Sequence, residues 1–320
     1  MKNLVRSLCA CLALAISAAP AAATGDKPET IRVTYVSAPF NVPSIVMRAK
    51  GFLDEAFKPL NIKVESPEIT SGAKQVQALA AGEIQIASVL GGASAIVGSA
   101  NGVDVKIIAV YSRSPEAFFI MTGKDGVADV AALKGKTVAG PKGTTLHQLL
   151  ASALAKNGMT LADIDHVNMD IPAARAALLA GKVDAALLAG NNALAVEQAG
   201  GKVLASGKGL IQPTTVIAVR GDLIEKHPEI VKVYLDAHKK ALAFMKDNSE
   251  EALKLAADEQ KISIEDAQRM MGWYDFSIRM TDQDVANLDA DQDFMIEAGM
   301  LKKKIDIRKD LVASSAFTIE

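Results

Sequence analysis

The chain has 320 residues, 50% of them hydrophobic, and a formal net charge of -2 at pH 7, so it can bury either one large core or two lobes of ordinary size. Acidic and basic residues are mixed along the chain, and only 4% of the residues are aromatic. These features exclude a basic nucleic-acid surface and argue against base- or sugar-stacking platforms.

The N-terminal segment has the pattern of a secretory signal peptide. Lys2 and Arg6 form a basic start, and the apolar run from Leu8 to Ile16 is too short to span a bilayer. Ala21-Ala22-Ala23 then offers a small-residue cleavage site, so residues 1–23 are predicted to be removed on export. No later segment has the length of a membrane helix.

Cysteine and histidine usage argues against metal, thiol and covalent chemistry. Cys9 and Cys11 both lie in the signal segment, so the exported chain is expected to have no disulfide; a lipid-attachment site at Cys11 is the alternative. The sequence also lacks a Walker A motif and the G-x-S-x-G and G-x-G-x-x-G motifs. We therefore predict no metal, no cofactor and no catalytic residue. The four histidines, which show no metal-ligand spacing, are His147, His166, His227 and His238.

Strands and helices are predicted to alternate through the first half of the chain. An apolar stretch then runs from Val105 to Gly123, and its polar break at Ser112–Pro115 suggests a crossing between two lobes. The predicted elements are a strand at 31–36, a helix from Pro43, a strand at 62–65, a helix after Ser71, a strand at 84–89 and a helix from Gly92.

The second half continues the alternation and ends in helices. The strand at 214–220, "TTVIAVR", is predicted to return the chain to the first lobe. From Asp222 onward, apolar residues recur at helical spacing with charged residues on the opposite face, and this amphipathic pattern predicts an almost wholly helical C-terminal region. The elements before the return are strands at 137–139, 166–169 and 183–189, with helices inside 140–158 and from Pro172.

One unit occurs twice. "ALAAGEIQIASVLGGASA" begins at Ala78, and "ALLAGKVDAALLAGNNAL" begins at Ala177. Each copy reads as helix, glycine stop, apolar strand, glycine turn and new helix, and the strands are apolar enough for a parallel sheet buried on both faces. Chance reuse of a common unit is one interpretation, and two similar α/β lobes is the other.

Several predicted helix starts share a chemistry suited to an anion. They offer glycines, hydroxyls and amides with few charges, and helix N–H groups and dipoles favour negative charge. In an open α/β sheet, such turns lie beyond the carboxyl ends of the strands, where ligands bind. The turns are "SAPFNVPS" (37–44), "ITSGAK" (69–74), "LGGAS" (90–94), "KGTTLH" (142–147) and "AGNNA" (189–193).

Each of these turns also has a purely structural interpretation. Thr145 and Gln148 have the spacing of a capping box, and Gly158 is a candidate helix stop. The turn glycines serve tight turns equally well, and His147 lies at the flank of its apolar stripe. Asp170 is expected to cap the helix through Pro172, with contact to a cationic ligand group as the alternative. Phe40 and Trp273 are expected in the core or the wall of a cleft.

At these residues the chain resembles the periplasmic binding proteins for taurine, aliphatic sulfonates and nitrate. The resemblance spans essentially the whole mature chain. The segments that carry it are "SGAKQVQALAAGEIQIASVLGGA", "LKGKTVAGPKGTTLHQLLASALAKNG", "AALLAGKVDAALLAGNNA", "HPEIVKVYLDAHKKALAFMKDNSEEALKLAA" and "DQDFMIEAGML".

The resemblance implies a type II periplasmic binding protein: two doubly wound α/β lobes joined by a two-strand hinge. Its lobes would comprise residues 24–115, then 116–209, then 210–320 returning to the first lobe with the C-terminal helices. It further implies a periplasmic monomer that passes a small organic anion to an ABC permease and its ATPase. Carried over by position, the ligand residues are Phe40, Asn41, Ser71, Gly72, Gly91, Gly92, Thr144, Thr145, His147 and Asn191.

The sequence also departs from this family. Gly190-Asn191-Asn192 stands where members often carry an aromatic and a proline, which leaves the ligand open among taurine, alkanesulfonates, nitrate and pyrimidines. The cysteine-rich motif of the related pyrimidine synthases is missing, and an export signal replaces the DNA-binding helices of related regulators. Two other functions stay open: an exported enzyme acting on a pyrimidine or tetrapyrrole precursor, and a ligand-presenting partner of a membrane sensor.

Overall fold

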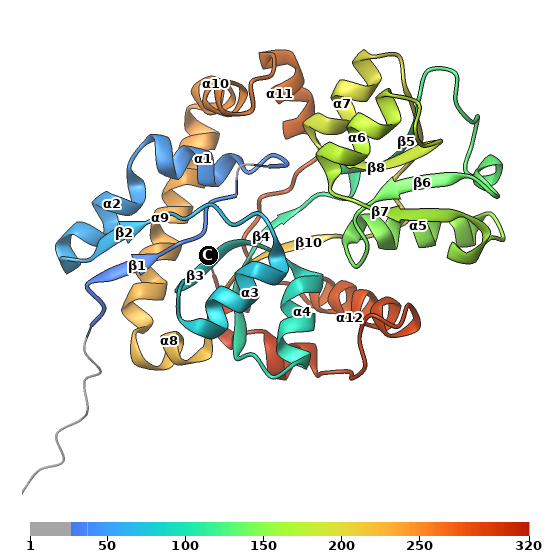
Figure 1. The fold of residues 1–320 in the computed structure, drawn as a ribbon. Helices are drawn as coiled ribbons and strands as arrows, with labels where there is room; N and C mark the ends of the chain where they lie inside the picture. The colour runs from blue at the N-terminus through green and yellow to red at the C-terminus, as the bar shows by residue number, and fades with distance from the viewer. Residues whose placement is uncertain (1–26, 37, 320) are drawn as a thin grey trace, which may run out of the picture.

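The computed structural model describes residues 27–36 and 38–319, so the predicted signal peptide at residues 1–23 lies outside it. Two groups of elements lie side by side in Figure 1. We call them the first unit, which contains β1–β4, β10, α1–α4 and α8–α12, and the second unit, which contains β5–β9 and α5–α7. The predicted lobe boundaries at residues 115 and 209 stay a prediction.

The first unit holds two small sheets. β1 (Thr30–Arg32) pairs in parallel with β2 (Lys63–Glu65). β10 (Thr214–Arg220) runs antiparallel between β3 (Ile86–Gly91) and β4 (Val105–Arg113). The strand predicted at residues 214–220 is therefore present, and it pairs with strands that precede residue 115. The expected parallel sheet around residues 84–89 is wrong for this strand, whose one parallel partner is the isolated bridge between Ile86 and Val33.

The second unit has one five-stranded sheet in the order β7-β6-β8-β5-β9. Strands β6, β7 and β8 are parallel, while β5 is antiparallel to β8 and β9. Strand β9 was not expected from the sequence, because it is an edge strand whose first two residues, Lys202 and Val203, are exposed. The strands are β5 (Phe118–Thr122), β6 (Thr137–Gly140), β7 (Asp165–Asn168), β8 (Ala185–Ala189) and β9 (Lys202–Ser206).

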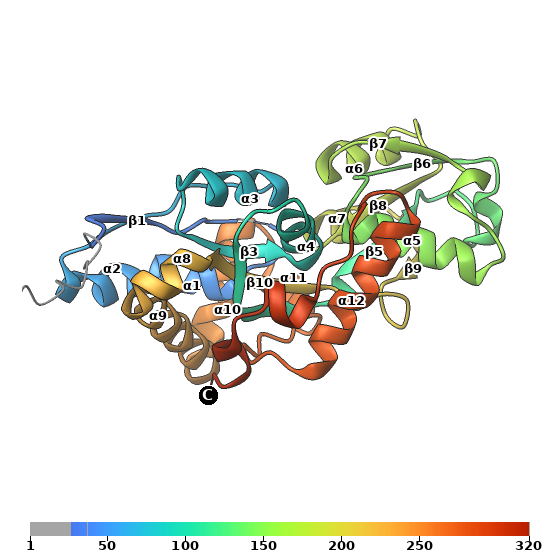
Figure 2. The ribbon, with the colours of Figure 1, turned by 90° about the horizontal axis from the view of Figure 1, so that it is seen from below.

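Helices cover both faces of the first unit's strands (Figure 2). The helix predicted from Pro43 is broken at Gly51 into two helices. The helices are α1 (Val42–Ala49), α2 (Phe52–Phe57), α3 (Gly72–Ala81), α4 (Gly92–Ala100), α5 (Thr145–Lys156), α6 (Ile171–Leu179), α7 (Asn191–Gln198), α8 (Gly221–Lys226), α9 (Pro228–Asp247), α10 (Ser249–Gln260), α11 (Ile264–Met271) and α12 (Asp282–Glu297).

The two sequence copies fold alike. The first forms α3, β3 and α4, and the second forms α6, β8 and α7. Gly82 and Gly181 occupy the same place after the first helix of each copy, with φ of 72° and 64°. Only glycine adopts this left-handed conformation without strain, which explains why both copies keep it as the helix stop.

Strand β10 contributes alternate side chains to two hydrophobic clusters, one on each face of its sheet. Ile217 and Val219 pack into a cluster with α1, α2 and α9–α11. Val216 and Ala218 pack into a second cluster with α3, α4 and α12. Because alternate side chains of a strand point to opposite faces, a strand covered by helices on both sides needs apolar residues at every position.

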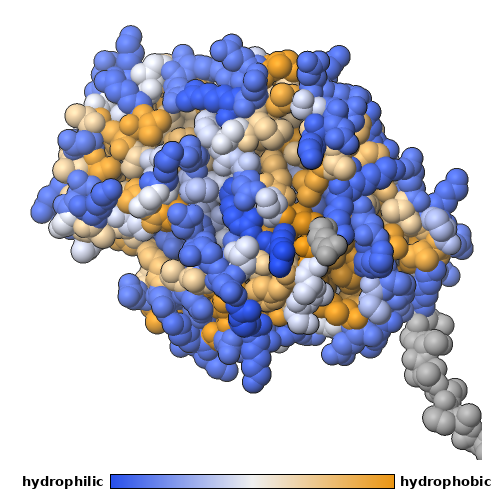
Figure 3. Space-filling model, turned by 180° about the vertical axis from the view of Figure 1, so that it is seen from behind, coloured by the Kyte–Doolittle hydropathy of each residue, from blue (hydrophilic) through white to orange (hydrophobic). Residues whose placement is uncertain are grey.

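Within residues 27–36 and 38–319, no helix is both long and apolar enough to cross a membrane. On the face shown in Figure 3, hydrophilic side chains are spread over the surface and interrupt the apolar patches. The exposed large apolar residues are scattered rather than gathered: Leu179, Val203, Ile264 and Ile296.

Asp170 caps α6, as expected. Its Oδ1 accepts a hydrogen bond from the Ala173 N–H at 2.8 Å. Asp170→Ala should therefore lower the free energy of unfolding by about 1 kcal/mol, whereas Asp170→Asn, which keeps a capping oxygen, should cost much less. Urea denaturation of both variants measures the difference. Equal losses in the two variants would show that the carboxylate acts through something other than the cap.

Candidate functional site

The starts of α3 and α4 lie against each other. A Cβ placed on Gly72 would come within 2.3 Å of Ser94 Oγ, so the two turns approach as closely as backbone permits. Ser71 caps α3, because its Oγ accepts a hydrogen bond from the Lys74 N–H at 3.4 Å. The structure therefore brings Ser71 and Gly72 beside the turn that carries Gly91 and Gly92.

The two glycines before α4 differ in role. A Cβ on Gly92 would meet Leu288 Cδ2 at 2.5 Å and the Thr214 carbonyl oxygen at 2.9 Å. A Cβ on Gly91 would meet nothing within 4 Å. Gly92 is therefore required by close packing against β10 and α12, whereas Gly91 leaves the backbone of the turn open.

The loop before α1 meets the turn after β8. A Cβ on Gly190 would lie 2.8 Å from Pro39 Cβ and 3.2 Å from the Pro39 carbonyl oxygen. Phe40 is fully buried, with its ring 5.9 Å from that of Tyr274. Asn41 is 2% exposed, and its Nδ2 donates to the carbonyls of Val36 and Ala38 at 2.9 and 3.0 Å. The side chains of Phe40 and Asn41 thus hold this loop in place where it touches the second unit.

The start of α5 differs from the predicted capping box. Thr144, not Thr145, is the N-cap residue, and its Oγ1 donates to the Pro141 carbonyl at 3.0 Å instead of accepting from the helix. The Gln148 side chain donates to Asp291 Oδ1 at 2.7 Å. The predicted pairing of Thr145 with Gln148 is therefore wrong, because Gln148 has a stronger, charged partner on α12. No side-chain cap satisfies the first N–H groups of α5.

His147 is held as a neutral imidazole. Only 7% of it is exposed, and its Nδ1 accepts a hydrogen bond from the Gly143 N–H at 3.2 Å. Burial, together with the charge of Lys142, lowers the pKa of His147 below 6.5. The ring lies 5.0 Å from that of His166, whose pKa burial lowers to about 4. At neutral pH, the remaining proton of His147 is therefore on Nε2.

Helix α12 brings the starts of α4 and α5 to one place. Leu288 packs where Gly92 enters α4, and Asp291 binds Gln148 of α5. These two residues are three positions apart, so they lie on the same face of α12 about one turn apart. Gly92 and Gln148, which come from different units, thus both contact α12, at positions about one turn apart.

Asn191 begins α7 and faces the helices of the first unit. Its Nδ2 donates to Gln260 Oε1 at 3.2 Å and its Oδ1 accepts from Asn192. It lines a cavity of about 340 Å³ between α6–α7 and α10–α11. Ser71 lines a separate groove of about 570 Å³ along the outer side of α3. Neither cavity joins Asn191 to the Thr144–His147 turn.

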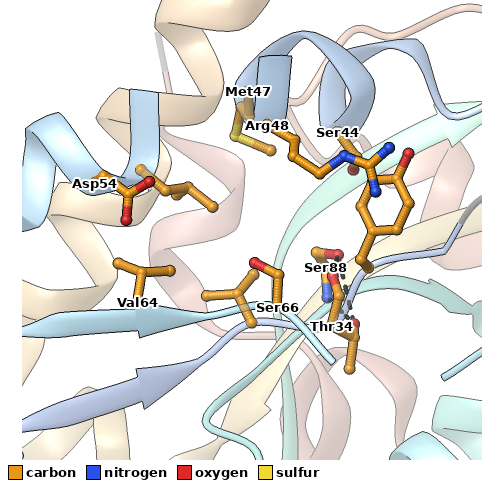
Figure 4. A pocket seen from close by; sticks show the side chains of 11 residues that line it. Thr34, Ser44, Met47, Arg48, Asp54, Val64, Ser66 and Ser88 are labelled. Carbon is orange, nitrogen blue, oxygen red and sulfur yellow. Dashed lines mark hydrogen bonds between the residues drawn. The ribbon is translucent and has the colours of Figure 1, made fainter. Parts of the chain in front are cut away.

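A further cavity of about 240 Å³ lies inside the first unit and contains none of the ten predicted ligand residues (Figure 4). Several of its polar groups already have partners within the fold. Thr34 Oγ1 accepts a hydrogen bond from the Ser88 N–H at 3.0 Å, and Arg48 pairs with Glu259 at 2.5 Å while lying 3.9 Å above the Tyr35 ring. Because Arg48 and the hydroxyls of Thr34 and Ser88 bond within the fold, we interpret these groups as core structure rather than as ligand contacts.

One candidate residue was missed by the sequence reasoning. Thr214, at the start of β10, is 4% exposed, and its Oγ1 has no hydrogen-bond partner among the described residues. Its carbonyl oxygen contacts the position where Gly92 enters α4. A buried unpaired hydroxyl beside a helix start is a site for a ligand or an ordered water. The signal in the sequence was a polar residue opening an otherwise apolar strand.

Residues 27–36 and 38–319 contain no group of three or more His, Cys, Asp or Glu side chains placed to hold a metal ion. The candidate groups for binding an anion are the N–H groups and hydroxyls at the starts of α3, α4 and α5.

The chain is similar to a known family of proteins. The model of the family described as NMT1/THI5 like matches residues 40–252, about two thirds of the chain. A putative aliphatic sulfonates-binding protein of Bacillus subtilis is 27% identical, over 84% of this chain and 82% of its own length. The taurine-binding periplasmic protein of Escherichia coli is 32% identical, over 64% of each chain.

Solved structures give the same fold. The alkanesulfonate-binding protein SsuA of Xanthomonas axonopodis pv. citri, bound to MOPS, has a TM-score of 0.80 and 22% identity, covering 90% of this chain and 99% of its own. The periplasmic aliphatic sulphonate binding protein SsuA of Escherichia coli has a TM-score of 0.78 and 24% identity, covering 89% and 92%. The chain therefore belongs to the NMT1/THI5-like family and has the periplasmic binding protein fold.

Proposed function

We propose that this chain is the periplasmic solute-binding component of an ABC importer and that it captures a small organic sulfonate. Its relatives named above are sulfonate- and taurine-binding proteins, and the expected signal peptide is consistent with export. Delivery to a membrane permease and its ATPase is part of the proposal. So is the division into lobes at residues 24–115, 116–209 and 210–320, with the ligand between them and the protein acting as a monomer.

The observation that supports this proposal is that the starts of α4 and α5 both contact α12. The first N–H groups of α5 lack a side-chain cap, and α4 opens with Gly91 and Gly92. Two helix N-termini that converge from different units supply partial positive charge and N–H donors without a buried arginine. A sulfonate has one negative charge spread over three acceptor oxygens, which suits several such donors.

The remaining predicted residues are proposed to complete this site. Ser71 and Gly72 adjoin the α4 start, and Thr145 and His147 lie in the first turn of α5. Phe40, Asn41 and Asn191 are proposed as supporting residues at the neighbouring contact of the two units, because their side chains already have protein partners.

A thermal-shift screen tests the proposed ligand class. A ligand that binds only the folded protein stabilises it by about 2.7 kcal/mol at 100 times its Kd. Taurine and short alkanesulfonates should raise the melting temperature, with nitrate, pyrimidines and flavins as the comparison set. A shift with pyrimidines alone would replace the sulfonate assignment, and no shift with any small solute would contradict the importer proposal itself.

A further inference from the structure

Helix α12 contacts the start of α5 through two residues, and Met300, just after the helix, approaches the preceding turn. Gln148 Nε2 donates to Asp291 Oδ1 at 2.7 Å, and the rings of His147 and Phe294 meet edge to face at 6.2 Å. The Met300 sulfur lies 3.6 Å from where a Cβ on Gly143 would be. The first unit thus contacts the proposed ligand turn of the second unit, and the only charged group in these contacts is the Asp291 carboxylate.

That carboxylate lies in an environment that disfavours its charge. Asp291 is 7% exposed, and burial raises its pKa to about 6, although the hydrogen bond from Gln148 acts in the opposite direction. Several charged groups near it already have opposite partners: Asp284 with Arg113, Asp293 with Lys304, and Arg308 with Asp282. The other titratable groups on the packed elements are Lys142, His147 and Lys156 before and on α5, His166 beside His147, Arg220 on β10, Asp289 and Glu297 on α12, and Lys302, Lys303, Lys309 and Asp310 after it.

We propose that Asp291 is a positioning residue for the ligand helix: it holds Gln148 so that the start of α5 sits on α12, and closure of the two units takes up one proton on this carboxylate. The proton comes from solvent and adds to Oδ2, while Oδ1 continues to accept from Gln148. The proposal rests on the ligand site proposed above. It adds a residue that the comparison with relatives does not identify, and a dependence of capture on pH.

The direction of the pH effect follows from the two states. In the proposed open form, Asp291 is exposed to water and has its ordinary pKa of 3.8, whereas in this structure, which the proposal takes as the closed form, burial raises the pKa to about 6. The closed form therefore binds the proton more tightly. Ligand affinity should be greatest below pH 3.8, and it should fall as the pH rises from 3.8 to about 6, the two pKa values of Asp291. Above the higher pKa of about 6, the ligand affinity should be constant and about 100-fold weaker, since each unit of pKa difference is a factor of ten in affinity.

Asp291→Asn tests the proposal, because asparagine keeps the acceptor oxygen and removes the charge. We use taurine and ethanesulfonate as probes in calorimetric titrations from pH 4.5 to 8, each in two buffers of different ionisation enthalpy. Wild type should take up close to one proton at pH 5, and its affinity should fall toward pH 8. Asp291→Asn should take up almost none and bind up to about 100-fold more tightly at pH 8.

Asp289→Asn is the matched control on the same helix and should follow wild type. His147→Gln removes the imidazole and should keep the Asp291-dependent part of the pH profile. Gln148→Ala removes the donor that lowers the pKa of Asp291, so the fall in affinity should extend to higher pH. If Asp291→Asn keeps the wild-type pH profile and proton uptake, Asp291 is merely structural and the proposal is overturned.

A ligand-free measurement separates this proposal from the proposed function. If neither sulfonate binds, the proposed ligand class has failed, and small-angle X-ray scattering of the unliganded proteins decides the role of Asp291. Wild type should become more compact between pH 7.5 and pH 5, whereas Asp291→Asn should be equally compact at both. The same radius change in both proteins, or none in wild type, would overturn the proton-linked closure.

Discussion

Arg113→Ala will lower the free energy of unfolding by about 3–5 kcal/mol, the cost of leaving one partner of a buried ion pair alone. Arg113 ends β4, and its Nε and Nη2 donate to the two carboxylate oxygens of Asp284 at 2.6 Å each. The Asp284 side chain is 2% exposed, so water cannot replace these bonds. Arg113 also donates to the carbonyls of Ser277 and Arg279 at 2.8 and 2.9 Å.

The pH dependence of this loss identifies its cause. Burial acts to raise the pKa of Asp284, but hydrogen bonds from Arg113 and Thr281 outweigh it and hold the pKa below 3.8. The stabilisation is therefore fully present above pH 3.8 and is lost as pH falls through the lower, folded value. In Arg113→Ala, burial dominates and Asp284 becomes protonated at higher pH. The stability difference from wild type should thus shrink in acid.

Urea denaturation at pH 7.5 and pH 3.5 measures both effects. Lys232→Ala is the control, because its pair with Asp236 is exposed and surface pairs contribute little. A neutral-pH loss for Arg113→Ala no larger than that of the control would contradict the view that this pair anchors β4 to the C-terminal segment.

Alanine at Thr145 or His147 will weaken binding of the sulfonate found in the thermal screen by about ten- to a hundredfold. A hydrogen bond to a charged group contributes about 1.5–3 kcal/mol, and each 1.4 kcal/mol is a factor of ten in affinity. Thr144→Ala should show a smaller effect, since its hydroxyl already donates to Pro141. Calorimetric titration measures the affinity of each variant.

A cap on α11, which is not one of the proposed ligand helices, provides the comparison for these variants. Ser263 Oγ accepts a hydrogen bond from the Asp266 N–H at 3.0 Å at the start of α11. Ser263→Ala should cost about 1 kcal/mol of stability without changing affinity. If the Thr145 and His147 variants behave like Ser263→Ala, with lower melting temperatures and unchanged binding, the start of α5 is structural and the proposed site is misplaced.

The burial of His147 also affects the pH range over which its protonation should influence ligand binding. A bound anion raises the pKa of a donating histidine, so binding weakens as pH rises through the range between the free and bound values. An unperturbed histidine, whose pKa is about 6.5, would place this range around neutrality. Because burial and Lys142 lower the pKa of free His147 below 6.5, the range begins on the acid side. His147→Gln and Asp291→Asn separate the two titrations, since each removes one of them.

Local sequence patterns predicted most elements and the repeated unit. Apolar spacing located α3, α4, α5 and α6, and the glycines at 82 and 181 end equivalent helices. Asp170 was recognised as a cap from its neighbours alone. These features depend on backbone geometry and side chains within one or two turns, so a short window contains their physical cause.

The choice of distant partners was decided only by the tertiary structure. Arg113 meets Asp284, 171 positions away, and Gln148 meets Asp291, 143 positions away. β3 lies antiparallel to β10 although its apolar run equally fits a parallel sheet. The spacing of apolar residues predicts whether a side chain is buried. It does not predict which distant group the side chain will contact, because that depends on how the layers of helices and strands pack together. The sequence by itself therefore determined the elements and the character of the helix starts, while the packing of α12 decided which starts face each other.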